Sequence, residues 1–350
     1  MSLQKKYIQL YSIITDSISD GTYVFGDKLP TELELSTKYG MSRQTVRQAL
    51  ELLERNEMIT KVQGSGSYVS SKAKAFKKTM RIAVITTYIS TYIFPHILRG
   101  IEEVATNSGY FIQLMATNNS IAKERDILQF LSGNVVDGII VEGTKTALPN
   151  PNLHFYQEFA CKTTPLVFFN GYYPELLQQS NCKIVTVTTD DYGGARKATA
   201  DLIQRGHRLI GGVFKSDDIQ GVRRFSGYAD ALTEANLRID DDCMIWFNTE
   251  NKYSPELKQN LNRLATACTA IVCYNDEIAF LLLAYLNSNP SSVTAIRSFD
   301  GTITGKQNID FVSYGHPNEL LGREAAEHMI QLLANKPVES LVMDWSTAQE

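Results

Sequence analysis

The sequence predicts an α/β protein with a small N-terminal α+β domain and a large two-lobed α/β domain with parallel sheets. First, a helix, glycine turn, helix pattern followed by two short strands fills the first 70 residues. Second, short apolar strands alternate with helices of 10–15 residues from residue 81 onward, as in parallel sheets covered on both faces. Third, the alternation starts afresh at residue 184, which indicates two lobes with a cleft between them.

The composition is that of an ordinary globular protein. The 350 residues are 43% hydrophobic and carry a formal net charge of −4. No apolar run approaches the roughly 18 residues that suggest a membrane span, and the first residues lack the apolar core of a signal peptide. We therefore expect a cytoplasmic protein with no membrane partner.

Cysteine usage and motif content point away from catalysis. The five cysteines are an odd number without C-x-x-C spacing, which favours buried thiols in a reducing compartment over disulfides or zinc. They are Cys161, Cys182, Cys243, Cys268 and Cys273. The sequence has no Walker loop, nucleophile elbow or H-E-x-x-H motif. We expect no catalytic residues, no metal and no cofactor.

The first 40 residues predict two helices. Apolar residues recur with helical period over residues 7–18. Thr31 is a good N-cap, and Glu34 stands three residues later, as in a capping box. A short helix over residues 32–39 would then end at Gly40 and lead directly into another helix.

The helix that follows Gly40, N-capped by Ser42, has a basic face and an apolar face. Arg43 and Arg47 are four residues apart and therefore share one side. The opposite side is apolar at helical spacing, with Val46, Ala49, Leu50 and Leu53. Such a helix suits a groove of DNA. Taken alone, the pattern fits an ordinary solvated amphipathic helix equally well.

A strand pair follows this helix. Residues 59–62 and 68–69 read as strands around a turn that contains Gly64 and Gly66. Two glycines allow the backbone of such a turn to approach phosphate or a minor groove closely. Helix, tight turn and helix form the helix-turn-helix plan, whose second helix enters the major groove, and the strand pair adds a wing.

Charge supports a nucleic-acid partner at this end of the chain. Residues 1–78 contain 12 Lys and Arg against 8 Asp and Glu, a net charge of +4, while the remainder carries −8. Four lysines follow the wing: Lys72, Lys74, Lys77 and Lys78. They fit a solvated linker or additional phosphate contacts that would weaken with salt.

Residues 7–70 resemble the winged-helix domain of GntR-family bacterial transcription regulators. The resemblance rests on Leu29-Pro30-Thr31-Glu32, on residues 42–50 and on residues 63–69, in order and at the right spacing. Glu57 stands where the family usually has glycine, Thr31 replaces its usual serine and Met41 its usual valine. The resemblance implies that double-stranded operator DNA is bound by Thr31, Glu32, Ser42, Arg43, Gln44, Thr45, Arg47, Gly64 and Gly66.

In the lobes, polar and aromatic side chains gather where predicted strands end. Open parallel sheets bind ligands at the carboxyl ends of their strands. Sugars are neutral polyols, for which Arg offers a donor fork and Asp a pair of acceptors. The candidate effector-binding residues are Tyr92, Phe94, His96, Glu142 and Lys145 in the first lobe, and Arg224, Asp276, Asp300 and His316 after later strands.

Several of these residues also have a purely structural explanation. Arg224 could bridge to Asp217 or Asp218, and Asp276 could cap the helix that follows it. Asp300 could simply form a turn with the glycine after it. Glu142 and Lys145 could pair with each other. From the residues alone, caps and turns are the commoner use of these aspartates.

Residues 81–350 resemble the effector domain of LacI/GalR-type repressors, which is related to periplasmic sugar-binding proteins. The match is collinear and covers nearly this whole part, although Arg297-Ser298 departs from the usual lead-in to Asp300. Its main motifs are residues 98–103, 136–140, 189–195, 202–208, 224–228, 273–279 and 298–300. The expected domains are 1–71, a linker over 72–80, and 81–350, with lobes of 81–187 plus 301–332 and of 188–300 plus 333–350.

A GntR-type domain joined to a LacI-type domain is similar to the arabinose-responsive regulators of bacilli. This resemblance implies a ligand-responsive repressor that binds operator DNA as a homodimer and is released by a small sugar, L-arabinose or a similar one. It favours effector contacts for Arg224, Asp276 and Asp300. The alternatives are a sensor of another sugar or a nucleoside, a pyridoxal-phosphate enzyme-like regulator, and a plain sugar-binding protein.

Overall fold

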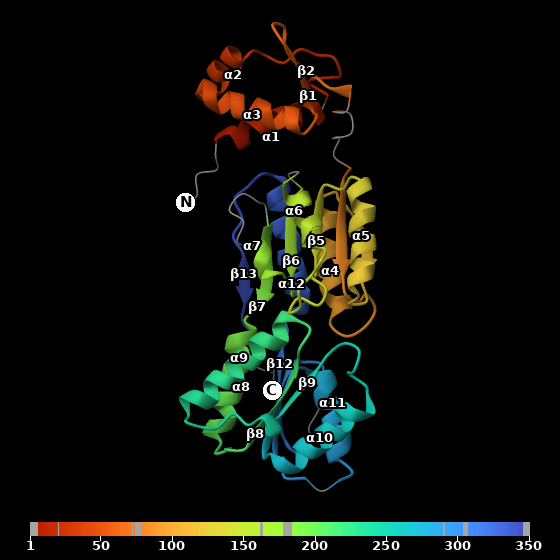
Figure 1. The fold of residues 1–350 in the computed structure, drawn as a ribbon, viewed down its shortest axis with the longest axis vertical. Helices are drawn as coiled ribbons and strands as arrows, with labels where there is room; N and C mark the ends of the chain where they lie inside the picture. Colours follow the sequence, from red (N-terminus) through yellow and green to blue (C-terminus); the bar gives the residue numbers. More distant parts are fainter. Residues whose placement is uncertain are drawn as a thin grey trace.

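The computed structural model describes residues 6–19, 21–71, 73, 79–161, 164–177, 184–289, 291–303 and 307–345. A small N-terminal domain, here called the head, lies at one end of an elongated molecule, followed by two α/β lobes (Figure 1). The predicted fold class is confirmed, because each lobe contains one parallel sheet. Within the described residues, no helix is both long and apolar enough to cross a membrane.

The head contains the predicted helices and wing. Its elements are α1 (Lys6–Ser19), α2 (Glu32–Tyr39), α3 (Arg43–Arg55), β1 (Ile59–Val62) and β2 (Gly66–Val69). The capping box of Thr31 and Glu34 is present at the start of α2, and Gly40 ends α2 in the left-handed conformation with φ 61°. Glu57, at the family's usual glycine position, also adopts a left-handed φ of 54°, so the wing forms without that glycine.

Lobe 1 is a six-stranded parallel sheet in the order β13-β7-β6-β5-β3-β4. Helices α4 and α12 cover one face, and α5, α6 and α7 the other. The strands are β3 (Arg81–Thr86), β4 (Phe111–Ala116), β5 (Gly138–Val141), β6 (Leu166–Phe169), β7 (Ile184–Thr189) and β13 (Leu341–Met343). The helices are α4 (Phe94–Asn107), α5 (Ile121–Gly133), α6 (Leu153–Cys161), α7 (Pro174–Leu177) and α12 (Asn318–Leu333).

Lobe 2 is a five-stranded parallel sheet in the order β12-β11-β10-β8-β9. Helices α8 and α9 cover one face, and α10 and α11 the other. The strands are β8 (Ile210–Lys215), β9 (Met244–Phe247), β10 (Ala270–Cys273), β11 (Ala295–Asp300) and β12 (Asp310–Gly315). The helices are α8 (Asp191–Gln204), α9 (Ile219–Glu234), α10 (Pro255–Ala267), α11 (Asp276–Leu286) and a 3₁₀ turn over Asp241–Cys243.

The predicted lobe boundaries need correction near the C-terminus. β12 pairs with β11 and therefore belongs to lobe 2, although residues 301–332 were expected in lobe 1. β13 pairs with β7 in lobe 1, although residues 333–350 were expected in lobe 2. After β13 the chain crosses once more, because Trp345 packs in the core between the lobe 2 sheet and α8 and α9. Strand pairing at the sheet edges, not chain order, decides these memberships.

The thiols only partly follow expectation. Cys268 and Cys273 are buried and Cys243 is partly buried, but Cys161 at the end of α6 is exposed, so the expected burial is wrong there. Cys182 lies outside the described residues, as do Lys72, Lys74, Lys77 and Lys78.

Candidate functional site

Helix α3 presents a polar face away from the core of the head. Val46, Ala49, Leu50 and Leu53 are buried in that core, while Arg43, Gln44 and Arg47 are exposed. The Ser42 hydroxyl accepts a hydrogen bond from the Thr45 amide at 3.1 Å and so caps the helix. The first turns of α3 therefore carry a guanidinium, an amide and hydroxyls that are open to an incoming ligand.

The two residues at the start of α2 that were expected to contact DNA already have hydrogen-bond partners within the head. The Thr31 hydroxyl accepts from the Glu34 amide at 3.3 Å as part of the capping box. Glu32 accepts from Arg47 of α3, with a shortest separation of 3.1 Å. Thr31 and Glu32 thus position α2 and Arg47, and any DNA contact by either residue remains a prediction.

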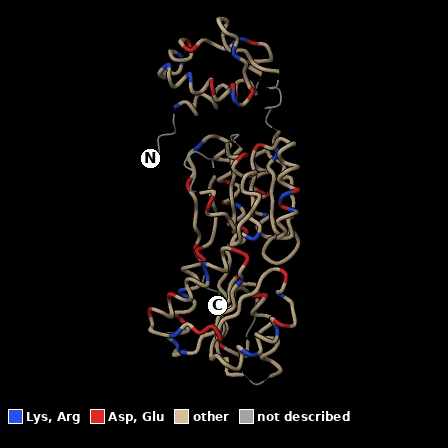
Figure 2. The backbone as a smooth tube through the Cα atoms, viewed as in Figure 1, with Lys and Arg blue, Asp and Glu red and all other residues tan. Residues whose placement is uncertain are grey.

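The wing tip depends on two glycines in conformations that favour glycine. Gly64 has φ 76° and Gly66 has φ 129°. A Cβ on Gly66 would come within 2.9 Å of Cε of Lys28, a flexible side chain that can move aside, so the backbone φ and not space favours glycine here. Figure 2 shows Lys and Arg interspersed with Asp and Glu in the head. The described residues of the head carry seven of each sign, so the positive balance of residues 1–78 comes from lysines outside the described residues.

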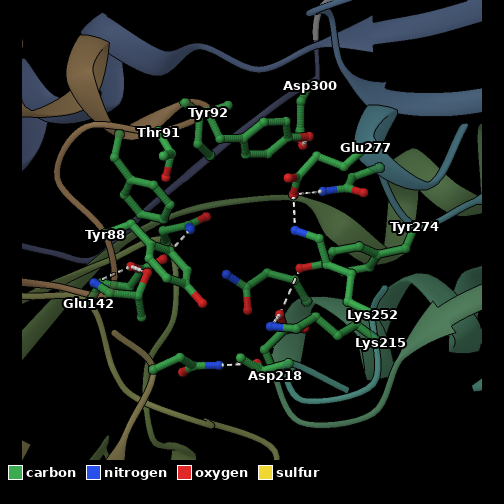
Figure 3. A pocket seen from close by; sticks show the side chains of 18 of the residues that line it. Tyr88, Thr91, Tyr92, Glu142, Lys215, Asp218, Lys252, Tyr274, Glu277 and Asp300 are labelled. Atoms are coloured by element: carbon green, nitrogen blue, oxygen red, sulfur yellow. Dashed lines mark hydrogen bonds and ion pairs between the residues drawn. The ribbon is translucent and has the colours of Figure 1, made fainter. Parts of the chain in front are cut away.

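A cavity of about 340 Å³ lies between the two lobes. Its walls come from the carboxyl ends of strands in both lobes, where parallel sheets usually bind ligands. Figure 3 shows the lining side chains pointing toward one another across it. Lobe 1 contributes Thr87, Tyr88, Thr91, Tyr92, Ile93, Phe94, Asn119, Glu142, Gly143 and Asn170. The rest are Lys215, Asp218, Gln220, Arg224, Phe247, Thr249, Lys252, Tyr253, Tyr274, Asn275, Glu277, Asp300 and His316.

Glu142 forms the floor of the lobe 1 side, directly after β5. Its carboxylate accepts from the Thr87 amide at 3.0 Å, the Thr87 hydroxyl at 2.5 Å and the Asn170 side-chain amide at 2.6 Å. Burial raises the pKa of Glu142, and these hydrogen bonds oppose that rise. The carboxylate is therefore held rigidly, and it does not pair with Lys145 as one alternative supposed.

Arg224 lies on the lobe 2 side and is 4% exposed. Its guanidinium pairs with Asp191 at 2.8 Å, not with Asp217 or Asp218 as the structural alternative proposed. It also stacks against three rings, with 4.8 Å to Tyr274, 4.6 Å to Phe299 and 4.7 Å to Trp345. Burial raises the pKa of Asp191 to about 6 even though Arg224 lowers it.

Tyr92 and Asp300 meet across the cavity, as Figure 3 shows. The Tyr92 hydroxyl donates to a carboxyl oxygen of Asp300. Both residues have positive φ, 62° for Tyr92 and 98° for Asp300, a costly conformation that concentrates at ligand sites. Burial raises the pKa of Asp300 to about 8. The Gly301 amide after it donates to the Ser313 hydroxyl at 2.9 Å.

His316 and Phe94 complete the expected set within the cavity. The His316 ring lies 5.1 Å from that of Trp345 in an edge-on arrangement. Burial and, to a smaller extent, the nearby charge of Arg224 lower the pKa of His316 to about 3. The imidazole is therefore neutral at physiological pH. Phe94, at the start of α4, supplies an apolar wall.

Three expected effector residues do not line the cavity. His96 is exposed on α4. Lys145 has a left-handed φ of 48° and pairs with Glu250 of lobe 2. The Asp276 carboxylate accepts from the Thr302 amide at 2.6 Å and from Ser313 at 2.7 Å, and so fixes the loop after β11. Asn275, not Asp276, is the N-cap of α11.

Several lining residues were absent from the sequence-based set. Lys215 is the last residue of β8 and Asp218 lies in the loop after it; the Lys215 ammonium is 2.9 Å from Asp218 and 3.4 Å from Asp217. Despite burial, these carboxylates raise the pKa of Lys215. Lys252 follows β9 and lies 2.5 Å from Glu277 of α11. The strand-end rule applies to Lys215 and Asp218 as well, because both lie at the carboxyl end of β8.

Comparisons with known proteins agree with both halves of this description. The family described as bacterial regulatory proteins, gntR family, matches residues 6–69. The family described as periplasmic binding proteins and sugar binding domain of LacI family matches residues 79–343. The solved structure of the transcription regulator CcpA of Lactococcus lactis is similar in fold. It is 23% identical with a TM-score of 0.64, covering 78% of this chain and 98% of that one.

Two curated relatives match along almost the whole chain. An arabinose metabolism transcriptional repressor of Geobacillus stearothermophilus is 36% identical over 345 residues, 96% of this chain and 93% of that protein. A protein of the same name from Halalkalibacterium halodurans is 32% identical over 346 residues, 95% of this chain and 90% of that one. The chain therefore belongs to the LacI-type family of sugar-binding domains, joined to a GntR-family DNA-binding domain, and is a sugar-responsive transcription repressor.

Proposed function

We propose that the protein represses sugar-utilisation genes by binding operator DNA as a homodimer, and that L-arabinose releases it. In this proposal α3 enters the major groove, with Arg43 and Arg47 contacting bases or phosphates and the glycine wing lying against the adjacent backbone. The effector binds in the cavity between the lobes. The protein acts by binding and not by catalysis. L-Arabinose is chosen because both relatives are named arabinose metabolism repressors.

The charge balance of the cavity carries the proposal that the effector is an uncharged polyol. In the described chain, each cationic side chain that lines the cavity already has a carboxylate partner. Lys215 pairs with Asp218, Arg224 with Asp191 and Lys252 with Glu277. A phosphate or carboxylate ligand would have to compete with these carboxylates, of which Asp191 is buried. A neutral sugar needs only hydrogen bonds and an apolar wall, which Glu142, Asn170, Asp300 and Phe94 supply.

The proposed release mechanism uses the two-lobed architecture. Sugar bound between the lobes favours the closed cleft and thereby changes the spacing of the two heads in a dimer. A ligand shifts such an equilibrium only by its difference in affinity for the two states. The coupling must also be reciprocal, so operator DNA weakens sugar binding by the same factor by which sugar weakens operator binding.

A thermal-shift screen tests the effector. We expect L-arabinose to raise the melting temperature, because a ligand at a hundredfold excess over Kd stabilises the folded state by about 2.7 kcal/mol. Phosphorylated and acidic sugars should have no effect. A strong response to a sugar phosphate and none to a free sugar would contradict the charge argument.

Calorimetry with operator DNA tests the coupling. We expect the apparent Kd for L-arabinose to rise when the protein is saturated with its operator, by the factor measured in the reverse experiment. An affinity for the sugar that does not change on DNA would rule out release through lobe closure.

A further inference from the structure

Beside the cavity, residues 118–119 and 144–146 of lobe 1 meet residues 217–219 and 249–250 of lobe 2. We call this set the clasp. The Asn119 side-chain amide donates to the Thr249 hydroxyl at 2.5 Å, and the Ile219 amide donates to the Thr146 hydroxyl at 2.9 Å. Lys145 pairs with Glu250. These three contacts join the two lobes directly.

Each half of the clasp is tied together internally. On the lobe 1 side, the Lys145 amide donates to the Asn119 carbonyl oxygen Oδ1 at 3.0 Å, which links the loops after β4 and β5. On the lobe 2 side, the Thr249 hydroxyl donates to Asp217 at 2.6 Å and its amide to the same oxygen at 3.1 Å. The clasp therefore consists of two prearranged surfaces, each of which moves with its own lobe.

Backbone conformation singles out the lobe 1 half. Asn118, Asn119 and Lys145 have φ values of 49°, 53° and 48°. Asparagine tolerates this left-handed region, but lysine rarely adopts it. Costly backbone conformations persist where the surrounding structure enforces them, and they concentrate at ligand clamps and switch regions. The strain at Lys145 presents its ammonium group to the opposite lobe and not to the cavity.

We infer that Lys145 and Glu250 are positioning residues that set how readily the cleft closes, and with it the affinity for every effector. Neither residue lines the cavity, so neither touches the ligand in the closed state. The inference concerns lobe closure, and only its effect on sugar binding rests on the proposed function. Because Glu250 is largely exposed, the pair should be sensitive to salt.

Calorimetry with two free sugars, L-arabinose and D-xylose, tests the pair through affinity and selectivity. Lys145→Met and Glu250→Gln should each weaken both sugars by the same factor, about two- to fivefold, with their affinity ratio unchanged. The charge-swapped double variant, Lys145→Glu with Glu250→Lys, should recover much of the loss. In 1 M salt the wild-type affinity should fall to that of the single variants, since screening removes the contribution of the pair in the wild type.

Glu234→Gln is the matched control. It removes an equally exposed carboxylate that pairs with Arg196 at 2.7 Å between α8 and α9, inside lobe 2. It should leave both sugar affinities unchanged. A loss in this control as large as in Glu250→Gln would overturn the inference, as would a changed ratio of the two sugars in Lys145→Met.

Small-angle scattering without ligand separates this inference from the proposed function. The double variant Lys145→Met with Thr146→Val removes the ion pair and the acceptor of the Ile219 amide, so its ligand-free form should have a larger radius of gyration than the wild type. If the wild type binds no sugar but the double variant still expands, the proposed effector is wrong and the clasp stands. Equal radii would overturn the clasp, whatever the sugars do.

Discussion

The head and the lobes present their functional side chains in opposite ways. In the head, Arg43, Gln44 and Arg47 are exposed on a single helix, within one continuous stretch of sequence. In the lobes, Glu142, Arg224 and Asp300 are almost fully buried and come from the end of β5, from α9 and from the end of β11, which are far apart in the chain. The head is built to meet a large partner at its surface, and the lobes to enclose a small one.

This difference predicts how each region responds to substitution. An exposed side chain can be removed without leaving a buried partner unsatisfied, so a change in the head should affect binding more than stability. Removing a buried, paired side chain leaves its partner unpaired in a low-dielectric interior. A substitution in the cavity should therefore reduce both ligand binding and stability. The following substitutions test that contrast, starting with the largest expected effect.

Arg224→Ala should abolish sugar binding and destabilise the protein by about 3–5 kcal/mol, because it leaves Asp191 buried without its counter-ion. Operator binding should persist, giving permanent repression. Urea unfolding, sugar calorimetry and operator titration would measure the three effects. A variant with wild-type stability and weak sugar binding would show that Arg224 is less coupled to Asp191 than the geometry indicates.

Arg43→Ala should weaken operator binding by about 1–3 kcal/mol while unfolding at the wild-type urea concentration. The side chain is exposed and helix α3 keeps its Ser42 cap and its apolar face. Fluorescence anisotropy with labelled operator would give the loss, and sugar calorimetry on the same sample should match the wild type. Reduced sugar affinity in this variant would break the proposed division between head and lobes.

Asp300→Asn should change how stability depends on pH. Since burial raises the pKa of Asp300 to about 8, the folded state holds a proton that the unfolded state releases near pH 4. Asp300 thus makes the wild type lose stability as pH rises from about 4 to about 8, a loss that the asparagine variant should lack. Urea midpoints at several pH values would compare the two, and parallel curves would contradict a buried, protonated Asp300.

Glu32→Gln should have the smallest effect, because it breaks an exposed ion pair with Arg47. Stability should hardly change, because solvent screens an exposed ion pair. Operator affinity should rise slightly, since a carboxylate near the DNA phosphates is removed and Arg47 is freed. Glu54→Gln, which breaks the similarly exposed pair with Lys61, is the control. A large loss of operator affinity in Glu32→Gln would instead indicate that Glu32 itself positions Arg47 for DNA.

Sequence reasoning succeeded wherever the deciding interactions are local. The capping box at Thr31, the turn at Gly40 and the Ser42 cap each involve residues within a few positions of one another, and all three are present. Most strands and helices of the lobes were also predicted, because apolar periodicity is a local property. The exposed Cys161 was missed, since burial at the end of a helix depends on what packs against it.

The cavity shows where local reasoning ends. Tyr92, Glu142, Arg224 and Asp300 were selected because they follow strand ends, and the structure brings them around one cavity. The same reasoning selected Lys145 and Asp276. Lys145, however, pairs with Glu250 of the opposite lobe, and Asp276 accepts a hydrogen bond from the loop after β11. Strand-end position is visible in sequence, but the direction of a side chain depends on local φ and on neighbours from distant segments.

The sequence by itself determined the kinds of element, the amphipathic helix α3 of the head and the two-lobed class, because caps, turns and apolar periods are encoded within short windows. Tertiary structure alone decided which strand joins which sheet, so that β12 and β13 exchanged their expected lobes. It also decided which charged side chains pair: Arg224 pairs with Asp191, and Lys145 pairs with Glu250. Pairing depends on distances between side chains remote in sequence, and only the packed chain sets those distances.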